Sequence, residues 1–137
     1  MRLWHKDLIR YLPRQQLIAQ WRECCCIARN INQNGSPNHI LVNKIMEYPE
    51  DEFNTYADVV IKEMRNRGYE VDDWKFFKWR NDKNSILPSV VFRGWHNRRY
   101  LDQCFYNLQE KYDRGGISKE EWKILEDGYS RLKQSSF

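Results

Sequence analysis

Apolar side chains recur at helical spacing along most of this chain, and this pattern constrains the fold more than any other sequence feature. Residues 14–31 are rich in strong helix formers and contain no Gly or Pro. Pro13 can occupy the first helical position, where no backbone N–H is needed, and the turn-forming residues 32–37 end the helix. The residues predicted to share its buried face are Leu17, Trp21, Cys24 and Ala28.

Three later stretches predict further helices. The second begins at Asp51 and ends in a basic turn before Gly68, as helix C-termini often do. The third covers about residues 97–113. The fourth opens at Ser118, with Glu121 three residues later in the spacing of a capping box.

Two connections remain between these helices. Residues 39–46 fit either a helical turn or a strand, and residues 69–94 read as a long irregular connection that could hold a short strand at 89–92. A chain of 137 residues suits one hydrophobic core. We therefore predict an all-α protein, a single compact domain over residues 1–137 with three to four helices and a long irregular connection.

Charge is unevenly distributed along the chain. The formal net charge is only +4, yet residues 1–30 carry six basic and two acidic side chains, and residues 74–100 carry seven basic and one acidic. The second block also holds seven aromatic residues. This combination suits contacts with phosphates and stacked bases, although a core loop with solvated Lys and Arg would look the same.

Composition excludes several classes of protein. No stretch approaches the roughly 20 apolar residues of a membrane span, and the N-terminus does not resemble a secretory signal. Cys24, Cys25, Cys26 and Cys104 form no CxxC pair, so we expect reduced thiols and no metal site. These features lead us to expect a cytoplasmic protein.

One acidic residue is isolated in the basic N-terminal block. Glu23 is the only Asp or Glu between Asp7 and Glu47, and it follows Arg22 directly. A surface ion pair with an arginine would explain it, but an isolated acid is also a candidate for catalysis. No Ser-His-Asp pattern or Gly-rich phosphate loop offers an alternative site.

Several motifs occur together in a fixed order. They are Leu17-x-Ala19-x-Trp21-Arg22-Glu23, then His39, then Arg67-Gly68-Tyr69, then Phe92-Arg93-Gly94, then Leu108-x-Glu110-Lys111. Over about residues 1–112 this arrangement resembles the pyrimidine-dimer DNA glycosylases of the phage endonuclease V type. The opening MRLWHKDLI and the following LPRQQL resemble the shorter cellular branch of that family.

The resemblance implies a DNA repair enzyme with glycosylase and abasic-site lyase activities, acting on cyclobutane pyrimidine dimers in double-stranded DNA. Its nucleophile would be the N-terminal α-amine, which forms an imine at the sugar C1′ before β-elimination, and Glu23 would be the essential acid. Because Arg2 is too large to favour removal of the initiator, we expect Met1 to supply the amine. The resemblance implies no cofactor, metal or membrane, and we expect a monomer that associates with the nucleoid.

The resemblance and the local charge also suggest which residues bind DNA. The expected DNA-binding residues are Arg2, Arg14, Arg22, Arg29, His39, Arg93, Arg98 and Lys111. Two positions depart from the family pattern, because Cys26 and Asn107 stand where arginines are expected. The candidates for a side chain that distorts the DNA are Trp4, Trp79, Trp95 and His96.

Two other functions fit the sequence. One is a non-catalytic helical module that binds DNA or RNA. The other is a helical interaction domain whose acidic segment 47–58 docks a basic partner.

Overall fold

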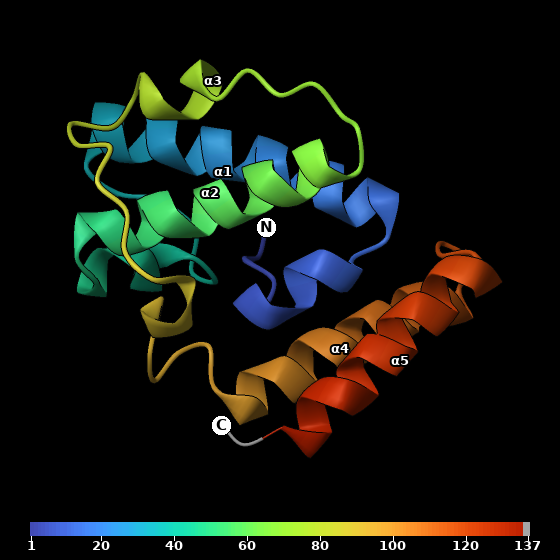
Figure 1. Cartoon of the computed structure of the whole chain (residues 1–137). Helices are drawn as coiled ribbons and strands as arrows, with labels where there is room; N and C mark the ends of the chain where they lie inside the picture. The colour runs from blue at the N-terminus through green and yellow to red at the C-terminus, as the bar shows by residue number, and fades with distance from the viewer. Residues whose placement is uncertain (136–137) are drawn as a thin grey trace.

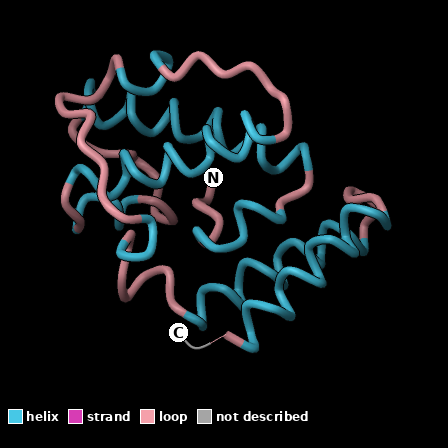
Figure 2. Tube along the Cα trace, viewed as in Figure 1, coloured by secondary structure: helices cyan, strands magenta, loops and turns pink. Residues whose placement is uncertain are grey.

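The computed structural model describes residues 1–135, and within them it contains helices but no strands (Figures 1 and 2). The α-helices are α1 (Arg14–Asn34), α2 (Glu50–Asn66), α3 (Trp74–Phe77), α4 (Arg98–Asp113) and α5 (Lys119–Gln134). Three 3₁₀ segments connect them: η1 (Lys6–Tyr11), η2 (Asn43–Glu47) and η3 (Pro88–Val90). The prediction of an all-α fold is confirmed. No helix among the described residues has the length and apolar character needed to cross a membrane.

The helices form two groups around the N-terminal segment (Figure 1). α1 packs beside α2 and against α3, whereas α4 and α5 form an antiparallel pair below them. In that pair Phe105 of α4 stacks on Tyr129 and Trp122 of α5. η1 contacts both α2 and α5, so the segment that begins the chain links the two groups.

The predicted helix boundaries need small corrections. Pro13 is the N-cap of α1 rather than its first helical residue, and α1 continues through residues 32–34 until Gly35 adopts a left-handed conformation (φ 77°). The fourth helix begins as predicted, because the Ser118 hydroxyl accepts the Glu121 N–H. The Glu121 carboxylate additionally accepts the N–H of Arg14 (2.8 Å), so α5 caps the start of α1.

Of the two alternatives for residues 39–46 the helical turn is correct, and the possible strand at 89–92 is wrong. Residues 43–47 and 88–90 form 3₁₀ turns, because no neighbouring extended segment pairs with them within residues 1–135. η1 and α3 were not predicted at all. Each is a short segment whose conformation depends on packing against other helices.

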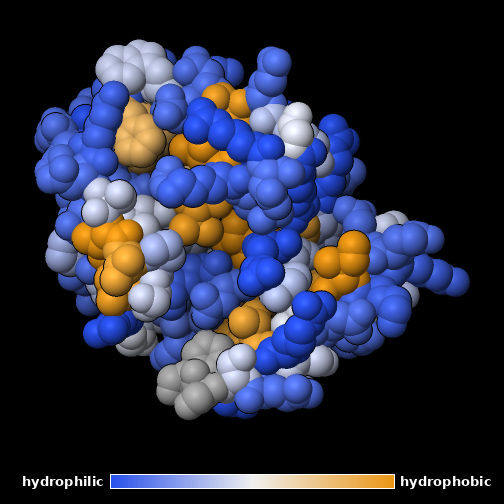
Figure 3. Space-filling model, in the orientation of Figure 1, coloured by the Kyte–Doolittle hydropathy of each residue, from blue (hydrophilic) through white to orange (hydrophobic). Residues whose placement is uncertain are grey.

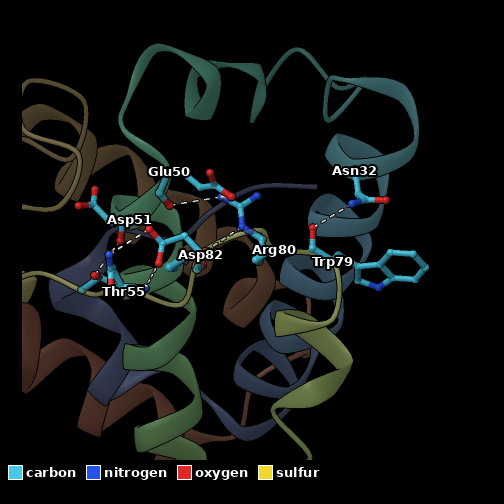
Figure 4. A network of polar contacts seen from close by, with 9 residues as sticks. Asn32, Glu50, Asp51, Thr55, Trp79, Arg80 and Asp82 are labelled. Carbon is cyan, nitrogen blue, oxygen red and sulfur yellow. Dashed lines mark hydrogen bonds and ion pairs between the residues drawn. The ribbon is translucent and has the colours of Figure 1, made fainter.

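Side chains at the start of α2 hold the long connection in place (Figure 4). Glu52 accepts the N–H of Phe92 (2.7 Å), and Thr55 accepts that of Ile86 (2.8 Å). Asn54 donates to the carbonyl of Asp82 (2.6 Å) and accepts from the guanidinium of Arg80 (2.8 Å). The connection therefore has irregular backbone but fixed anchor points.

The surface is mainly polar on the face drawn in Figure 3, where apolar groups emerge in separate patches. The buried apolar side chains form a cluster that extends from Leu3 to Leu125. Isolated exposed apolar residues are normal on protein surfaces. The exposed apolar residues on this face therefore do not by themselves indicate a functional site.

Candidate active site around Glu23

The first residues of the chain run through the interior, where buried polar side chains hold their backbone. Gln20 of α1 accepts the N–H of Trp4 (2.7 Å) and donates to the carbonyl of Arg2 (3.0 Å). Tyr100 of α4 donates to the carbonyl of Leu3 (2.6 Å). Tyr56 of α2 donates to that of Trp4 (2.6 Å). Three helices thus fix the position of residues 2–4.

A pair of buried histidines continues this anchoring. His5 Nδ1 accepts the Asp7 N–H (3.1 Å), so we assign the ring proton to Nε2, which donates to the carbonyl of His96 (3.0 Å). His96 Nδ1 accepts the N–H of Lys6 (3.0 Å), and the two rings stack with centroids 5.3 Å apart. Burial lowers the pKa of His5 to about 4 and that of His96 well below its usual range, so both rings are neutral at pH 7.

Glu23 lies beside the start of this anchored segment. Its Oε2 accepts the N–H of Arg2 (3.3 Å) and contacts Nε2 of Gln20 (3.4 Å). Three covalent bonds separate the Arg2 nitrogen from the α-amine of Met1, a path of about 4.3 Å. The α-amine therefore lies within roughly 8 Å of the Glu23 carboxylate. Met1 itself is 37% exposed, so solvent and ligands can reach it.

A cavity of about 540 Å³ opens next to Glu23. Three of the predicted DNA-binding residues line it together with Glu23: Arg14, Arg22 and Lys111. Within residues 1–135, no carboxylate lies at ion-pair distance from any of these three side chains. The cavity therefore joins one acid with cations that are free to bind an anionic ligand.

A second cavity, of about 670 Å³, lies beside Arg2. Arg2 lines it, together with Lys44 of η2 and Arg99 and Tyr100 of α4. Lys44 and Arg99 were not predicted as site residues from the sequence. Arg99 belongs to the basic block at 74–100, which was the available signal, whereas Lys44 carried none.

Other predicted site residues lie outside both cavities. His39 folds over its own turn, with Nδ1 accepting the N–H of Leu41 (3.2 Å). Arg98 donates to the carbonyl of Lys133 on α5 (2.6 Å), and the carbonyl of Arg93 accepts the Tyr48 hydroxyl (2.8 Å). Arg29 lines a third cavity, which Arg22 shares.

Burial separates the candidates for a DNA-distorting side chain. Trp4 and Trp95 are each 9% exposed and His96 is 3% exposed, because all three pack in the core around the N-terminal segment. A buried side chain cannot insert between bases without disrupting that core. Of the four candidates, only Trp79 is partly exposed.

Comparison with known proteins gave one match. A family model for pyrimidine dimer DNA glycosylases matches residues 1–76. No curated protein and no solved structure matched the chain. The matched region contains Met1, Gln20, Glu23 and Tyr56, whereas Tyr100 and His96 lie beyond it.

Proposed function

Because the chain belongs to the pyrimidine dimer DNA glycosylase family, we propose that it excises a damaged pyrimidine from DNA and cleaves the resulting abasic strand. The nucleophile in this proposal is the α-amine of Met1, and the acid–base group is Glu23. One observation carries the assignment: the N–H of Arg2 binds the Glu23 carboxylate, so the residue that precedes Arg2 starts beside that acid.

The first step is displacement at the sugar. The amine forms a bond to C1′ while the bond between C1′ and the base breaks, and the base leaves with the electron pair and takes up a proton. Glu23 stabilises the positive charge that develops on the sugar and accepts a proton from the attacking amine. An uncharged α-amine is a sufficient nucleophile for this step without a metal.

The second step is strand cleavage. Ring opening converts the adduct at C1′ into an imine, which withdraws electrons from C2′. Loss of a C2′ proton then expels the 3′ phosphate by β-elimination, and water releases the imine from the enzyme. Glu23 is the carboxylate beside the start of the chain and can accept the C2′ proton.

The surrounding cations fit the substrate. Arg14, Arg22 and Lys111 line the cavity of Glu23, and within residues 1–135 none of their side chains forms an ion pair. Phosphates on either side of a lesion would satisfy these charges. We propose a cyclobutane pyrimidine dimer as the lesion, on the basis of the family.

Trapping the imine tests the proposal. Protein with an authentic N-terminus, verified by intact mass, is incubated with an abasic-site duplex and borohydride. We expect a covalent adduct, and a tag fused ahead of Met1 should prevent it. An adduct that survives the tag would assign the nucleophile to a lysine instead.

The Glu23→Gln variant completes the test. It should bind the abasic duplex as tightly as the natural protein but give little strand cleavage. Absence of any adduct with the natural N-terminus would contradict the catalytic assignment and favour a non-catalytic DNA-binding module. A large loss of binding in Glu23→Gln would show that Glu23 is structural.

A further inference from the structure

A third cavity, of about 470 Å³, lies between α1 and the short helix α3. Its cationic residues come from segments about fifty positions apart in sequence: Arg22 and Arg29 on α1, Lys75 and Lys78 on and after α3. Within the described part of the chain none of the four has a carboxylate at ion-pair distance. The fold therefore concentrates unpaired positive charge here, where phosphate is a matching ligand.

The lysines of this cavity face α1. The pKa of Cys25 is raised to about 11 by burial, and Lys75 and Lys78 oppose that rise through their positive charge. Cys25, Lys75 and Lys78 line the same cavity, and both lysine side chains are exposed to solvent. The positive charge of both lysines is therefore accessible to an anion that enters the cavity.

Trp79 forms an aromatic wall of the cavity and has a rigid backbone. Its carbonyl accepts from Asn32 of α1 (3.2 Å). The side chain of the next residue, Arg80, is 4% exposed and binds Asn54 and the carbonyl of Glu50. In Figure 4 the indole points away from this polar network. The Lys78 ammonium lies 5.0 Å from the ring centroid, so a cation and a flat aromatic surface are adjacent.

This cavity adjoins the one that contains Glu23. Ile18 and Arg22 line both. A strand with one phosphate near Arg22 could therefore continue from the Glu23 cavity across α1 to α3. Cations that follow a backbone, combined with an aromatic ring, are the usual elements of single-strand binding.

We propose that the α1–α3 surface, made of Arg22, Arg29, Lys75, Lys78 and Trp79, binds an unpaired segment of DNA. Trp79 stacks on a base, and the four cations contact the phosphates. The proposal extends the proposed repair function and rests on it for the choice of DNA. Its test nevertheless measures binding alone, so a failure of catalysis would not be mistaken for a failure of this surface.

The experiment is fluorescence anisotropy with a labelled twelve-residue oligothymidine at several salt concentrations. Trp79→Ala should weaken binding roughly tenfold, since stacking on one aromatic ring commonly contributes that much. Trp79→Phe keeps a ring and should retain most of the affinity. Trp74→Ala is the matched control, because Trp74 is the first residue of α3, close in sequence to Trp79, but is 55% exposed and outside the cavity.

The double variant Lys75→Gln/Lys78→Gln tests the cations without altering the core, because both side chains are exposed. Each lost phosphate contact should reduce the slope of log affinity against log salt by about 0.7. Lys62→Gln controls for net charge, because Lys62 pairs with Asp58 on α2.

Three outcomes would overturn the proposal. One is unchanged oligothymidine binding in both Trp79→Ala and the double lysine variant. Another is an equal loss in Trp74→Ala, which would show that the cavity has no special role. The third is that Trp79→Ala and the double lysine variant bind duplex DNA, or an RNA oligomer, more weakly but bind the DNA single strand as before.

Discussion

Replacing Gln20 with leucine should both destabilise the protein and slow imine formation. Gln20 is 1% exposed, and its amide binds the backbone of Trp4 and Arg2 while contacting Glu23. Leucine fills a similar volume but forms none of these hydrogen bonds. The variant therefore removes the bonds of Gln20 to the start of the chain, while the amine of Met1 and the carboxylate of Glu23 are chemically unaltered.

The expected loss of stability follows from the hydrogen-bonding groups that Gln20→Leu leaves unpaired. The Trp4 N–H has no other acceptor in the described structure, and a buried orphan donor costs about 1 to 3 kcal/mol. The Arg2 carbonyl belongs to a half-buried residue, so water can replace part of its bond. We expect a total loss of about 2 to 3 kcal/mol in the free energy of unfolding. With an unfolding entropy of about 0.3 kcal/mol/K for this length, Tm falls by roughly 7 to 10 °C.

The assay combines thermal melting with single-turnover trapping on an abasic duplex. A displacement of the amine by about 1 Å can cost roughly a hundredfold in rate, so trapping should slow by about that factor at saturating DNA. Gln16→Leu is the matched control one turn earlier on α1. The Gln16 side-chain oxygen is buried without a hydrogen-bond partner within residues 1–135, so Gln16→Leu should leave Tm unchanged or raise it. Because Gln16 also lines the Glu23 cavity, this variant controls for stability only.

Two results would refute this reasoning. If Gln20→Leu melts like the natural protein, the hydrogen bonds at Trp4 and Arg2 do not contribute as described. If Tm falls but the trapping rate is unchanged, Gln20 stabilises the fold without positioning the amine.

The remaining predictions concern the fold that supports the site. Because the pKa of His5 is about 4 when folded against 6.5 in the unfolded chain, the unfolded state binds more protons between these values. The His5 contribution should therefore lower the free energy of unfolding by about 3 kcal/mol from pH 7 to pH 4, measured by urea unfolding, with a further loss from His96, and His5→Gln should reduce that dependence. Arg80→Met should cost about 2 to 3 kcal/mol in the same assay, since it leaves Asn54 without its charged donor, and unchanged stability would contradict the anchoring role of Arg80. Gly128→Ala should cost about 1 to 3 kcal/mol, because the new methyl group would overlap the ring of Tyr11; a Tyr11→Ala background should remove most of that cost, and an equal cost in both backgrounds would exclude the clash.

The sequence predicts the long helices well because their signals are local. The buried face of α2, with Phe53, Tyr56, Val60 and Met64, follows directly from helical spacing, and the cap at Ser118 follows from residue type. η1 and α3 have no comparable signal, since they are one or two turns long and depend on contacts with distant helices. Likewise, the positive φ of Phe92 (53°) depends on its buried surroundings.

The candidate site was likewise predicted only in part from the sequence. The order of motifs pointed to Glu23, Arg14, Arg22 and Lys111, and the fold brings these four to one cavity. Gln20 was missed, although a polar residue at helical spacing between Leu17 and Cys24 on a buried face was an available signal.

The anchoring of the N-terminal segment also sets an order of events during synthesis. Leu3 bonds to a residue 97 positions later, and His5 to one 91 positions later. The chain loses conformational entropy when it closes loops of this length, and it gains the free energy of these contacts only afterwards. We therefore expect these bonds to form late in folding. The contacts that hold the start of the chain are thus completed last, and a nascent or truncated chain that lacks α4 would anchor residues 2–4 through α1 and α2 alone, without the bond from Tyr100 to Leu3.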